Sequence, residues 1–287
     1  MGMSPRLLRP RASGFTPKNI TGLVAWFDAD DASTFTLSGT AVSEWRDKSG
    51  NGYAVSQSTG NNQPARTGTV NGRATVDFDG TNDYLYSDDT GLASSFNGDK
   101  TVFMLAVGEM HNAAEYAVNG QGTWMSWGSS SSGTPYLYMR SNAGSGASQV
   151  VLRNDASSGT GGITSSGPAG DGAAAGTAKD FFICSCEVPS QSVLTWRCHT
   201  VMAAFGDGIG TRPLQGVEFT GSVARPSGAV TVNRFTIGAL GRNTFGDYYP
   251  ARISEVVVYS RIPTQSERRS LVTYLSKKYN NVSTPVV

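Results

Sequence analysis

Three aspartates near the start of the chain have the residue type and spacing to bind a metal ion. Asp28, Asp30 and Asp31 end the segment GLVAWFDADD, a short apolar run that begins at Gly22. Ca²⁺ takes about six to eight oxygen ligands, which clustered carboxylates can supply. The EF-hand spacing and its closing Glu are absent, so we favour the alternative, a strand end at which an Asp caps a turn. Calcium at these three residues is the only candidate cofactor that the sequence suggests.

Residues suited to acid–base or nucleophilic catalysis are few. The chain has two histidines, His111 and His199, and neither has metal-ligand residues close to it in the sequence. A Gly-x-Ser-x-Gly elbow, which presents a nucleophilic serine, is missing. No glycine-rich loop follows a predicted strand and opens a helix, so a phosphate cradle is not expected. We therefore expect no catalytic residues and predict a protein that is not an enzyme.

Aromatic side chains are candidates for a sugar-binding platform, which needs flat rings with a few polar groups beside them. They are Trp124, Trp127, Tyr136 and Tyr138 in the middle of the chain, and Phe245, Asp247, Tyr248 and Tyr249 before the last predicted strand. The alternative is that these rings fill the core or a contact between subunits. We favour that alternative for the tryptophans and leave it open for Tyr248 and Tyr249, which follow Gly246 in a turn.

Alternating apolar and polar residues predict strands that would position these side chains. In VDFDGTNDYL, Val76 and Phe78 share one face, the segment from Gly80 to Asp83 supplies a turn, and an extended run resumes at Tyr84. A period of two is typical of a strand with one buried face, and a Gly/Asn/Asp turn between two such runs favours antiparallel pairing. Further strands are predicted over 101–108, 124–127, 136–140, 181–187, 193–200, 230–240 and 253–259.

The C-terminal part predicts one helix, over 264–279. Thr264 and Glu267 fit a capping box, and Leu271 and Leu275 recur at helical spacing. An isolated helix of about fifteen residues is marginal in water. We therefore expect its apolar stripe to pack on the β-structure.

The first nineteen residues, 1–19, predict an extended basic arm. Arg6, Arg9, Arg11 and Lys18 occur there without an acid, and the apolar surface is too small to support folding alone. We expect this arm to dock on another subunit through those four cations; the alternative is a disordered tail. The segment also lacks the apolar core of a signal peptide, so ordinary secretory export is not expected.

Two further features concern the middle of the chain. Residues 154–178 are almost all Gly, Ser, Ala and Thr, which predicts either an exposed loop or a strap between subunits. The three cysteines, Cys184, Cys186 and Cys198, form no disulfide framework. Cys198 can pair only if the hairpin register brings it opposite a partner, and buried free thiols are our expectation.

Composition excludes some partners. The net charge of +1 gives no basic field for nucleic acid, and no run of about 18 apolar residues would cross a membrane. Charged residues make up 16% of the chain and glycines number 35, which suits many short strands joined by turns.

Four segments together resemble laminin-G-like domains of the concanavalin A-like lectin/glucanase superfamily, of the kind found in bacteriophage structural and bacterial surface proteins. They are GLVAWFDADDASTF, VSEWRDKSGNG, VDFDGTNDYL and ARISEVVVYSRIPTQSERRSLVTYLSKKY. The resemblance covers about 20–282 and implies an all-β fold: a two-sheet antiparallel jelly-roll sandwich, here with one C-terminal helix and the N-terminal arm. It also implies binding to sugars or proteins, with calcium at one rim in some members.

The superfamily includes glucanases, so the resemblance requires that this activity be considered. A retaining glucanase needs two carboxylates about 5–5.5 Å apart. Glu255, Glu109, Glu187 and Glu218 each lack an acid two or four residues away on the same face of a strand. Asp77 and Asp79 do share a face, but we interpret them as structural because they lead into a turn. Two functions therefore remain. The first is a virion component, a capsid decoration or tail-associated protein made in the host cytoplasm and docked on other virion proteins. The second is a lectin module for cell-surface glycans, located outside the cell; either could be a homo-oligomer.

Overall fold

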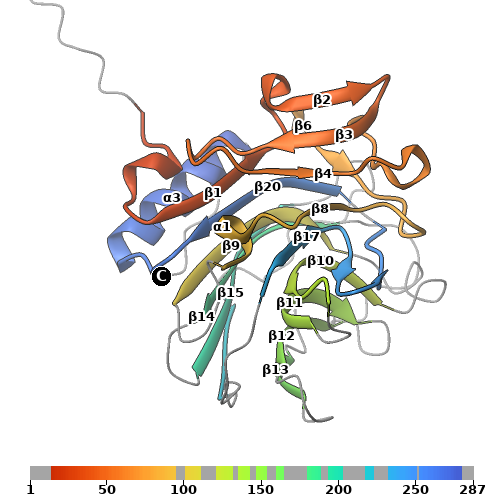
Figure 1. The fold of residues 1–287 in the computed structure, drawn as a ribbon. Coiled ribbons are helices and arrows are strands. Elements are labelled where there is room, and N and C mark those ends of the chain that lie inside the picture. The colour runs from red at the N-terminus through yellow and green to blue at the C-terminus, as the bar shows by residue number, and fades with distance from the viewer. Residues whose placement is uncertain are drawn as a thin grey trace, which may run out of the picture.

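The computed structural model describes most of the chain. The described residues are 14–94, 101–110, 121–131, 135–142, 147–153, 160–164, 180–188, 193–202, 217–222, 232–250 and 252–279. Two antiparallel sheets face each other, and one long helix lies outside them (Figure 1). The predicted all-β sandwich with one C-terminal helix is confirmed.

The first sheet has seven strands in the order β1-β20-β9-β14-β15-β16, with β7 also paired to β20. Its strands are β1 (Leu23–Asp28), β7 (Val76–Asp77), β9 (Val102–Met110), β14 (Asp180–Val188), β15 (Val193–Met202), β16 (Val217–Ser222) and β20 (Arg252–Tyr259). The chain's first and last long strands, β1 and β20, pair with each other, which brings the two ends of the domain together.

The second sheet has nine strands in the order β13-β12-β11-β10-β17-β8-β4-β3-β2. They are β2 (Phe35–Ser38), β3 (Ala41–Arg46), β4 (Ala54–Ser56), β8 (Leu85–Ser87), β10 (Gln121–Gly128), β11 (Pro135–Asn142), β12 (Ala147–Arg153), β13 (Thr160–Thr164) and β17 (Arg234–Ile237). Two short ribbons lie outside the sheets: β5 (Thr69–Val70) with β6 (Arg73–Ala74), and β18 (Leu240–Gly241) with β19 (Phe245–Gly246).

The helical elements are short except the last. They are the 3₁₀ turns η1 (Pro17–Asn19), η2 (Ala32–Thr34) and η3 (Gly60–Asn62), the single turn α1 (Thr90–Ala93), and α3 (Gln265–Lys278). Thr264 caps α3 and Glu267 reaches back to the Thr264 backbone, so the predicted capping box is confirmed. No helix in the part of the chain described here is long and apolar enough to cross a membrane.

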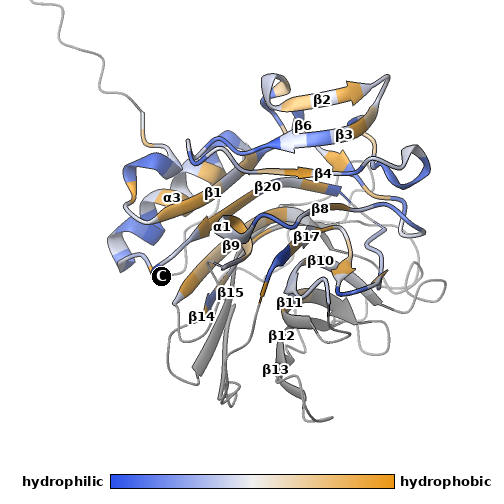
Figure 2. Cartoon of the chain, viewed as in Figure 1, coloured by the Kyte–Doolittle hydropathy of each residue, from blue (hydrophilic) through white to orange (hydrophobic). Residues whose placement is uncertain are grey.

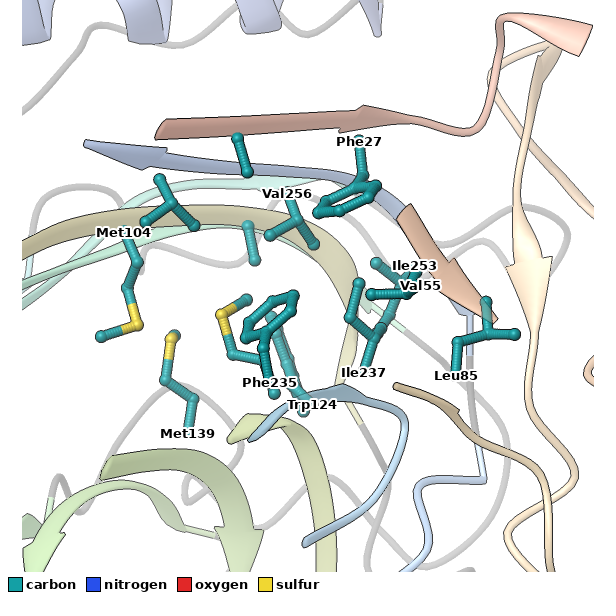
Figure 3. Close-up of a cluster of buried hydrophobic side chains, with 14 of the residues drawn as sticks. Phe27, Val55, Leu85, Met104, Trp124, Met139, Phe235, Ile237, Ile253 and Val256 are labelled. Atoms are coloured by element: carbon teal, nitrogen blue, oxygen red, sulfur yellow. The ribbon is translucent and has the colours of Figure 1, made fainter. Parts of the chain in front are cut away.

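The main core lies between the two sheets. Figure 3 shows Phe27, Met104 and Val256 from the first sheet pointing toward Trp124, Phe235 and Ile237 from the second. These side chains are at most 2% exposed. The expectation that Phe235 and Ile237 point inward is confirmed.

Strand β9 contributes to two cores at once. Val102, Met104 and Ala106 join the core between the sheets, whereas Phe103, Leu105 and Val107 join a second cluster with Leu271 and Leu275 of α3. An apolar run covered on both faces is what the sequence TVFMLAVG predicts for a central strand. Figure 2 accordingly shows β9 and β20 as largely hydrophobic ribbons. The helix is therefore a third layer, packed on the outer face of the seven-stranded sheet.

Two expectations for the middle of the chain have mixed outcomes. Residues 160–164 of the Gly/Ser/Ala-rich segment form β13 and pair with β12, so the predicted loop is wrong for those five residues; the rest of 154–178 lies outside the described residues. The β14–β15 register makes Cys184 and Cys198 direct neighbours across the hairpin. Cys186 is a buried free thiol, as expected.

Candidate functional site

Four aromatic rings meet on the nine-stranded sheet and form the candidate site, which we call the aromatic platform: Tyr84, Tyr86, Phe245 and Tyr248. The rings of Tyr84 and Phe245 stack at 3.9 Å between centroids, with 22° between their planes. Tyr86 lies 5.2 Å from Phe245, and Tyr248 lies 6.2 Å from Tyr84. Tyr84 is 9% exposed, whereas the other three rings are half-buried and present part of their surface to solvent.

The strand period places Tyr86 on the platform. In β8, Leu85 points into the core and is 0% exposed, so its neighbour Tyr86 takes the opposite face. Tyr86 pairs with Thr236 of β17, and β17 pairs in turn with β10 (Figure 1). The two central strands thus provide a rigid base for the ring.

The β18–β19 ribbon brings Phe245 and Tyr248 to the same place. The chain leaves β17 at Gly238, whose φ of +86° is a left-handed conformation that glycine adopts without strain. Ser126 of β10 holds the ribbon, because its hydroxyl donates to Ala239 O at 3.1 Å and accepts from Gly241 N at 2.8 Å. The ribbon also covers Tyr138, which packs with Leu240.

Arg234 supports the platform from below. Its guanidinium carbon lies 5.0 Å from the Tyr86 ring centroid and 4.8 Å from that of Phe245, a cation–π geometry with both rings. Nε and Nη2 donate to the two carboxylate oxygens of Asp88 at 2.6 and 2.7 Å, and Nη1 donates to Arg242 O at 2.6 Å. This bidentate pair fixes the plane of the guanidinium and therefore the spacing of the rings above it.

Polar groups surround the rings. Asp88 binds Arg234, Asn243 and Thr244 directly precede Phe245 in the chain, and all three are exposed. Burial raises the pKa of Tyr248, with a smaller contribution from Tyr84, and the Tyr248 hydroxyl donates to Phe245 O at 3.4 Å. Flat rings with hydroxyl, amide and carboxylate groups at their edge are suited to stacking on the C–H face of a sugar while bonding its hydroxyls.

The turn before Tyr84 carries two acids that have structural roles. The Asp79 carboxylate accepts from the backbone N–H groups of Thr81, Asn82 and Asp83 at 2.7–3.3 Å, and Asp83 accepts from the Asp79 N–H at 3.0 Å. Burial raises the pKa of Asp83 to about 6, with a smaller contribution from Asp79. The turn directly before Tyr84 therefore contains a carboxyl group whose burial is unfavourable when it is charged.

The structure places the candidate aromatic residues in different environments. Phe245 and Tyr248 belong to the platform, and Asp247 lies between them with a φ of +46°. Tyr249 is 0% exposed and packs at 5.6 Å from Trp124 in the core, which corrects its place among the ligand-binding candidates. Trp124, Trp127 and Tyr138 are also buried, as the favoured alternative for the tryptophans predicts, and the side chain of Tyr136 lies outside the described residues.

Sequence reasoning missed Tyr84, Tyr86 and Arg234. Tyr84 is the second-to-last residue of VDFDGTNDYL and Tyr86 directly follows the segment, and their spacing of two already places both side chains on one face of a strand. Their approach to Phe245, about 160 residues later in the chain, depends on strand order, which the local pattern does not contain.

The three aspartates proposed for calcium each contact a cation of the chain itself. Lys48 Nζ lies 2.9 Å from Asp28 and 2.8 Å from Asp31, Lys278 Nζ lies 2.5 Å from Asp28, and Arg73 lies 2.9 Å from Asp30. The bond from Lys48 lowers the pKa of Asp31 to about 2, with help from Ser33. Asp31 also caps η2 by accepting from Ser33 N, which is the turn-capping role that the sequence favours.

The acids weighed for catalysis are likewise engaged in structural bonds. Asp77 accepts from Thr67 Oγ1 at 2.6 Å and from Gly68 N at 2.5 Å, and it also contacts Thr75. Glu255 is 0% exposed beneath α3. Within the described residues, His, Cys, Asp and Glu side chains form no group of three that could hold a metal ion.

The start of the described chain lies against the sandwich. Phe15 packs at 6.1 Å from Tyr274 of α3, and Tyr259 donates to Pro17 O at 2.9 Å. Lys18 is exposed in η1. Arg6, Arg9 and Arg11 lie outside the described residues, so docking through them stays a prediction.

Comparison with known proteins gives likeness in structure alone. No protein-family model matches the chain, and no curated protein matches its sequence. The binding domain of Paraclostridial Mosquitocidal Protein 1 superposes with a TM-score of 0.51 at 12% identity, covering 93% of this chain and 54% of that one. Botulinum neurotoxin type C, whose cell entry depends on interaction with two ganglioside molecules, superposes with a TM-score of 0.55 at 8% identity over 91% of this chain and 52% of that one.

A leech intramolecular trans-sialidase also matches, with a TM-score of 0.45 at 15% identity over 67% of this chain and 26% of that one. The chain thus spans about half the length of the two toxin structures and about a quarter of the sialidase. The toxin matches show a shared jelly-roll fold, which agrees with the fold that the sequence resemblance implies. Neither a family model nor a sequence match supports the laminin-G-like assignment within that fold.

Proposed function

We propose that the chain is a non-enzymatic glycan-binding module whose aromatic platform stacks on a sugar ring. The observation that carries the proposal is the group of three half-buried rings, Tyr86, Phe245 and Tyr248, the first two of which stack on the Arg234 guanidinium. Partly exposed aromatic rings in a fixed arrangement present apolar area that a protein core would ordinarily bury. A sugar covers such area with its C–H face and satisfies the polar rim with its hydroxyls.

The fold likeness supports this proposal over a virion role. The neurotoxin that shares the sandwich interacts with gangliosides, which are glycan-bearing lipids. None of the three matched proteins compared with this chain is a capsid or tail protein. The arm on which the virion role depends lies mainly outside the described residues. A glycan-binding role would place the protein at a cell surface or outside the cell.

A glycan array followed by NMR titration of the best binder tests the platform. We expect Tyr86→Ala and Phe245→Ala each to weaken binding about tenfold, since loss of one stacking ring removes about 1–1.5 kcal/mol. Leu37→Ala is the control, because Leu37 is 41% exposed on β2 of the same sheet and outside the platform. Folded platform variants that bind the array as the unaltered chain does would refute the proposal.

The virion alternative has its own test. Deletion of residues 1–13 removes Arg6, Arg9 and Arg11 but leaves Phe15 and Pro17 on the sandwich. Glycan binding that persists without the arm supports the lectin role. Loss of assembly into a larger particle, with the fold intact, would instead support docking through the arm.

A further inference from the structure

A cleft of about 710 Å³ lies between α3 and the first described residues of the chain. Its walls come from the N-terminal segment, from β6 and from one face of the helix. The lining residues are Gly14, Phe15, Arg73, Arg269, Ser270, Thr273, Tyr274, Lys277 and Lys278. This volume falls within the usual range of small-molecule sites, about 300–1,000 Å³. The helix covers the outer face of the seven-stranded sheet (Figure 1). That sheet therefore lies between the cleft and the aromatic platform, which is on the other sheet.

The charge of the lining is one-sided. It contains four cations and no acid. Arg73 and Lys278 already bind Asp30, Asp28 and Glu255 beneath the cleft. Arg269 and Lys277 make no ion pair within the described part of the chain, and both are exposed. The positive charge available to a ligand therefore comes mainly from these two residues.

Helix geometry brings the two free cations to one side. Arg269, Thr273 and Lys277 are spaced by four residues, so they follow one face of α3. The only acid of the helix is Glu267, and Arg261 holds it at 2.6 Å on the first turn. Neither Arg269 nor Lys277 has an acid three or four residues away in the sequence, which is where a helix normally neutralises an exposed cation.

Two aromatic rings provide an apolar wall. Phe15 and Tyr274 meet edge to face, with 6.1 Å between centroids and 60° between planes, and both are only partly buried. Trp26 braces Tyr274 from the sheet side at 6.5 Å. A ligand that enters the cleft thus meets both an apolar ring surface and a pair of cations.

We propose that this cleft is a second binding site, separate from the platform, for a sugar-sized ligand that carries one anionic group, a carboxylate or a sulfate. Arg269 and Lys277 pair with the anion, and Arg offers two parallel N–H donors to it. Ser270 and Thr273 also line the cleft. Phe15 and Tyr274 contact the apolar face of the ring. The N-terminal residues 1–13 are poor occupants, because they add three arginines and no acid to a cationic site.

Titration with glucuronic acid, galactose 6-sulfate, galactose and inorganic sulfate tests the proposal. We expect one or both anionic sugars to shift the amide resonances around Thr273 and Tyr274, and galactose to leave them unchanged. The double variant Arg269→Ala/Lys277→Ala should weaken that binding at least about tenfold, since both charge-assisted contacts are lost. Comparison of the two anionic sugars identifies whether carboxylate or sulfate is preferred.

Lys18→Ala is the matched control, because Lys18 is an exposed cation in η1 that does not line the cleft. It should bind as the unaltered chain does. No shift with either anionic sugar, equal binding of inorganic sulfate alone, or full binding by the double variant would each overturn the proposal. The platform variants Tyr86→Ala and Phe245→Ala should retain binding at the cleft, so failure at one site is distinguishable from failure at the other.

Discussion

The carboxylate of Glu255 on β20 lies 2.7 Å from the Nζ of Lys278 near the end of α3. Glu255 is 0% exposed and also accepts from Trp26 Nε1 at 2.6 Å and from Tyr279 Oη at 3.0 Å. Burial raises the pKa of Glu255, whereas the charge of Lys278 opposes that shift. Lys278 also binds Asp28 at 2.5 Å. One lysine therefore connects the helix to two neighbouring strands: it pairs with the buried Glu255 and shares Asp28 with Lys48.

Lys278→Met should destabilise the protein strongly. The substitution keeps the length of the side chain but leaves Glu255 and Asp28 with one cation fewer in a buried place, which costs about 3–5 kcal/mol. The free energy of unfolding from urea titration measures this. Lys277→Met is the control, because the neighbouring side chain is exposed and should change stability by less than about 0.5 kcal/mol. Equal effects of the two variants would contradict a special role for Lys278.

Glu267→Gln should reduce stability at neutral pH but not in acid. The bond from Arg261 lowers the pKa of Glu267 from 4.5 to about 2, with further contributions from Thr264. A lowered folded-state pKa means that the stabilisation is complete above about pH 4.5 and disappears as the pH falls toward 2. Because the pair is partly exposed, we expect a loss on the order of 1 kcal/mol at pH 7. Unfolding at pH 7 and pH 2 checks this, and a loss that is equal at both values would refute it.

Asp83→Asn should have the opposite effect and increase stability above neutral pH. Burial raises the pKa of Asp83 from 3.8 to about 6, so the folded state holds its proton more tightly than the unfolded state. Its favourable contribution is present below about pH 3.8 and is lost as the pH rises through 6. The amide variant avoids burial of the charge and can still accept from Asp79 N. We expect it to be more stable than the unaltered chain at pH 8, by on the order of 1–2 kcal/mol, and equal to it at pH 3.5. A variant that is less stable at pH 8 would contradict this origin of the shift.

Local patterns were sufficient for several of the elements, though not for β13, and they did not locate the sites. The capping box at Thr264 and the apolar run of β9 depend on neighbours in the sequence, and the structure confirms both. The place of Lys278 is different, because helical spacing and a C-terminal charge describe an exposed lysine equally well. Its burial follows from Asp28 and Glu255, which come from two distant segments of the chain. Contacts of that kind depend on strand order, which no short pattern specifies.

The platform shows the same division. A turn and an extended run were predicted around Tyr84 from residue types, and Phe245 and Tyr248 were candidates from their composition. The stack of Tyr84 on Phe245 requires β8 and β17 to pair and the β18–β19 ribbon to fold back over the sheet. Gly238, just before the ribbon, is a clue in the sequence, because a Cβ there would clash with the Phe78 ring.

Gly238→Ala should destabilise the ribbon and weaken the platform. Its φ is +86°, and a Cβ there would approach the Phe78 ring to 2.3 Å. The variant thus combines left-handed strain of about 1–2 kcal/mol with overpacking of about 1–3 kcal/mol. Gly39→Ala separates the two effects, because Gly39 has a φ of +63° and no atom within 4 Å of its Cβ position. Thermal unfolding should show the larger loss for Gly238→Ala, and equal losses would mean that the contact with Phe78 relaxes freely.

Arg234→Lys should keep the positive charge beneath the platform but remove the fixed orientation of the guanidinium. A lysine cannot make the bidentate pair with Asp88 and the third bond to Arg242 O at the same time as it stacks under Tyr86 and Phe245. The rings should then lose their fixed spacing, which lowers the affinity of the preferred glycan about threefold to tenfold. Stability should fall by about 1–3 kcal/mol, because hydrogen bonds to charged groups are lost from a side chain that is 10% exposed. Arg46→Lys is the control: Arg46 pairs with Glu44 at 2.5 Å on the same sheet, but its side chain is 42% exposed and contacts no platform ring. Titration calorimetry measures the glycan affinity of both variants. An Arg234→Lys protein that binds the glycan with unchanged affinity would show that the cation does not position the rings.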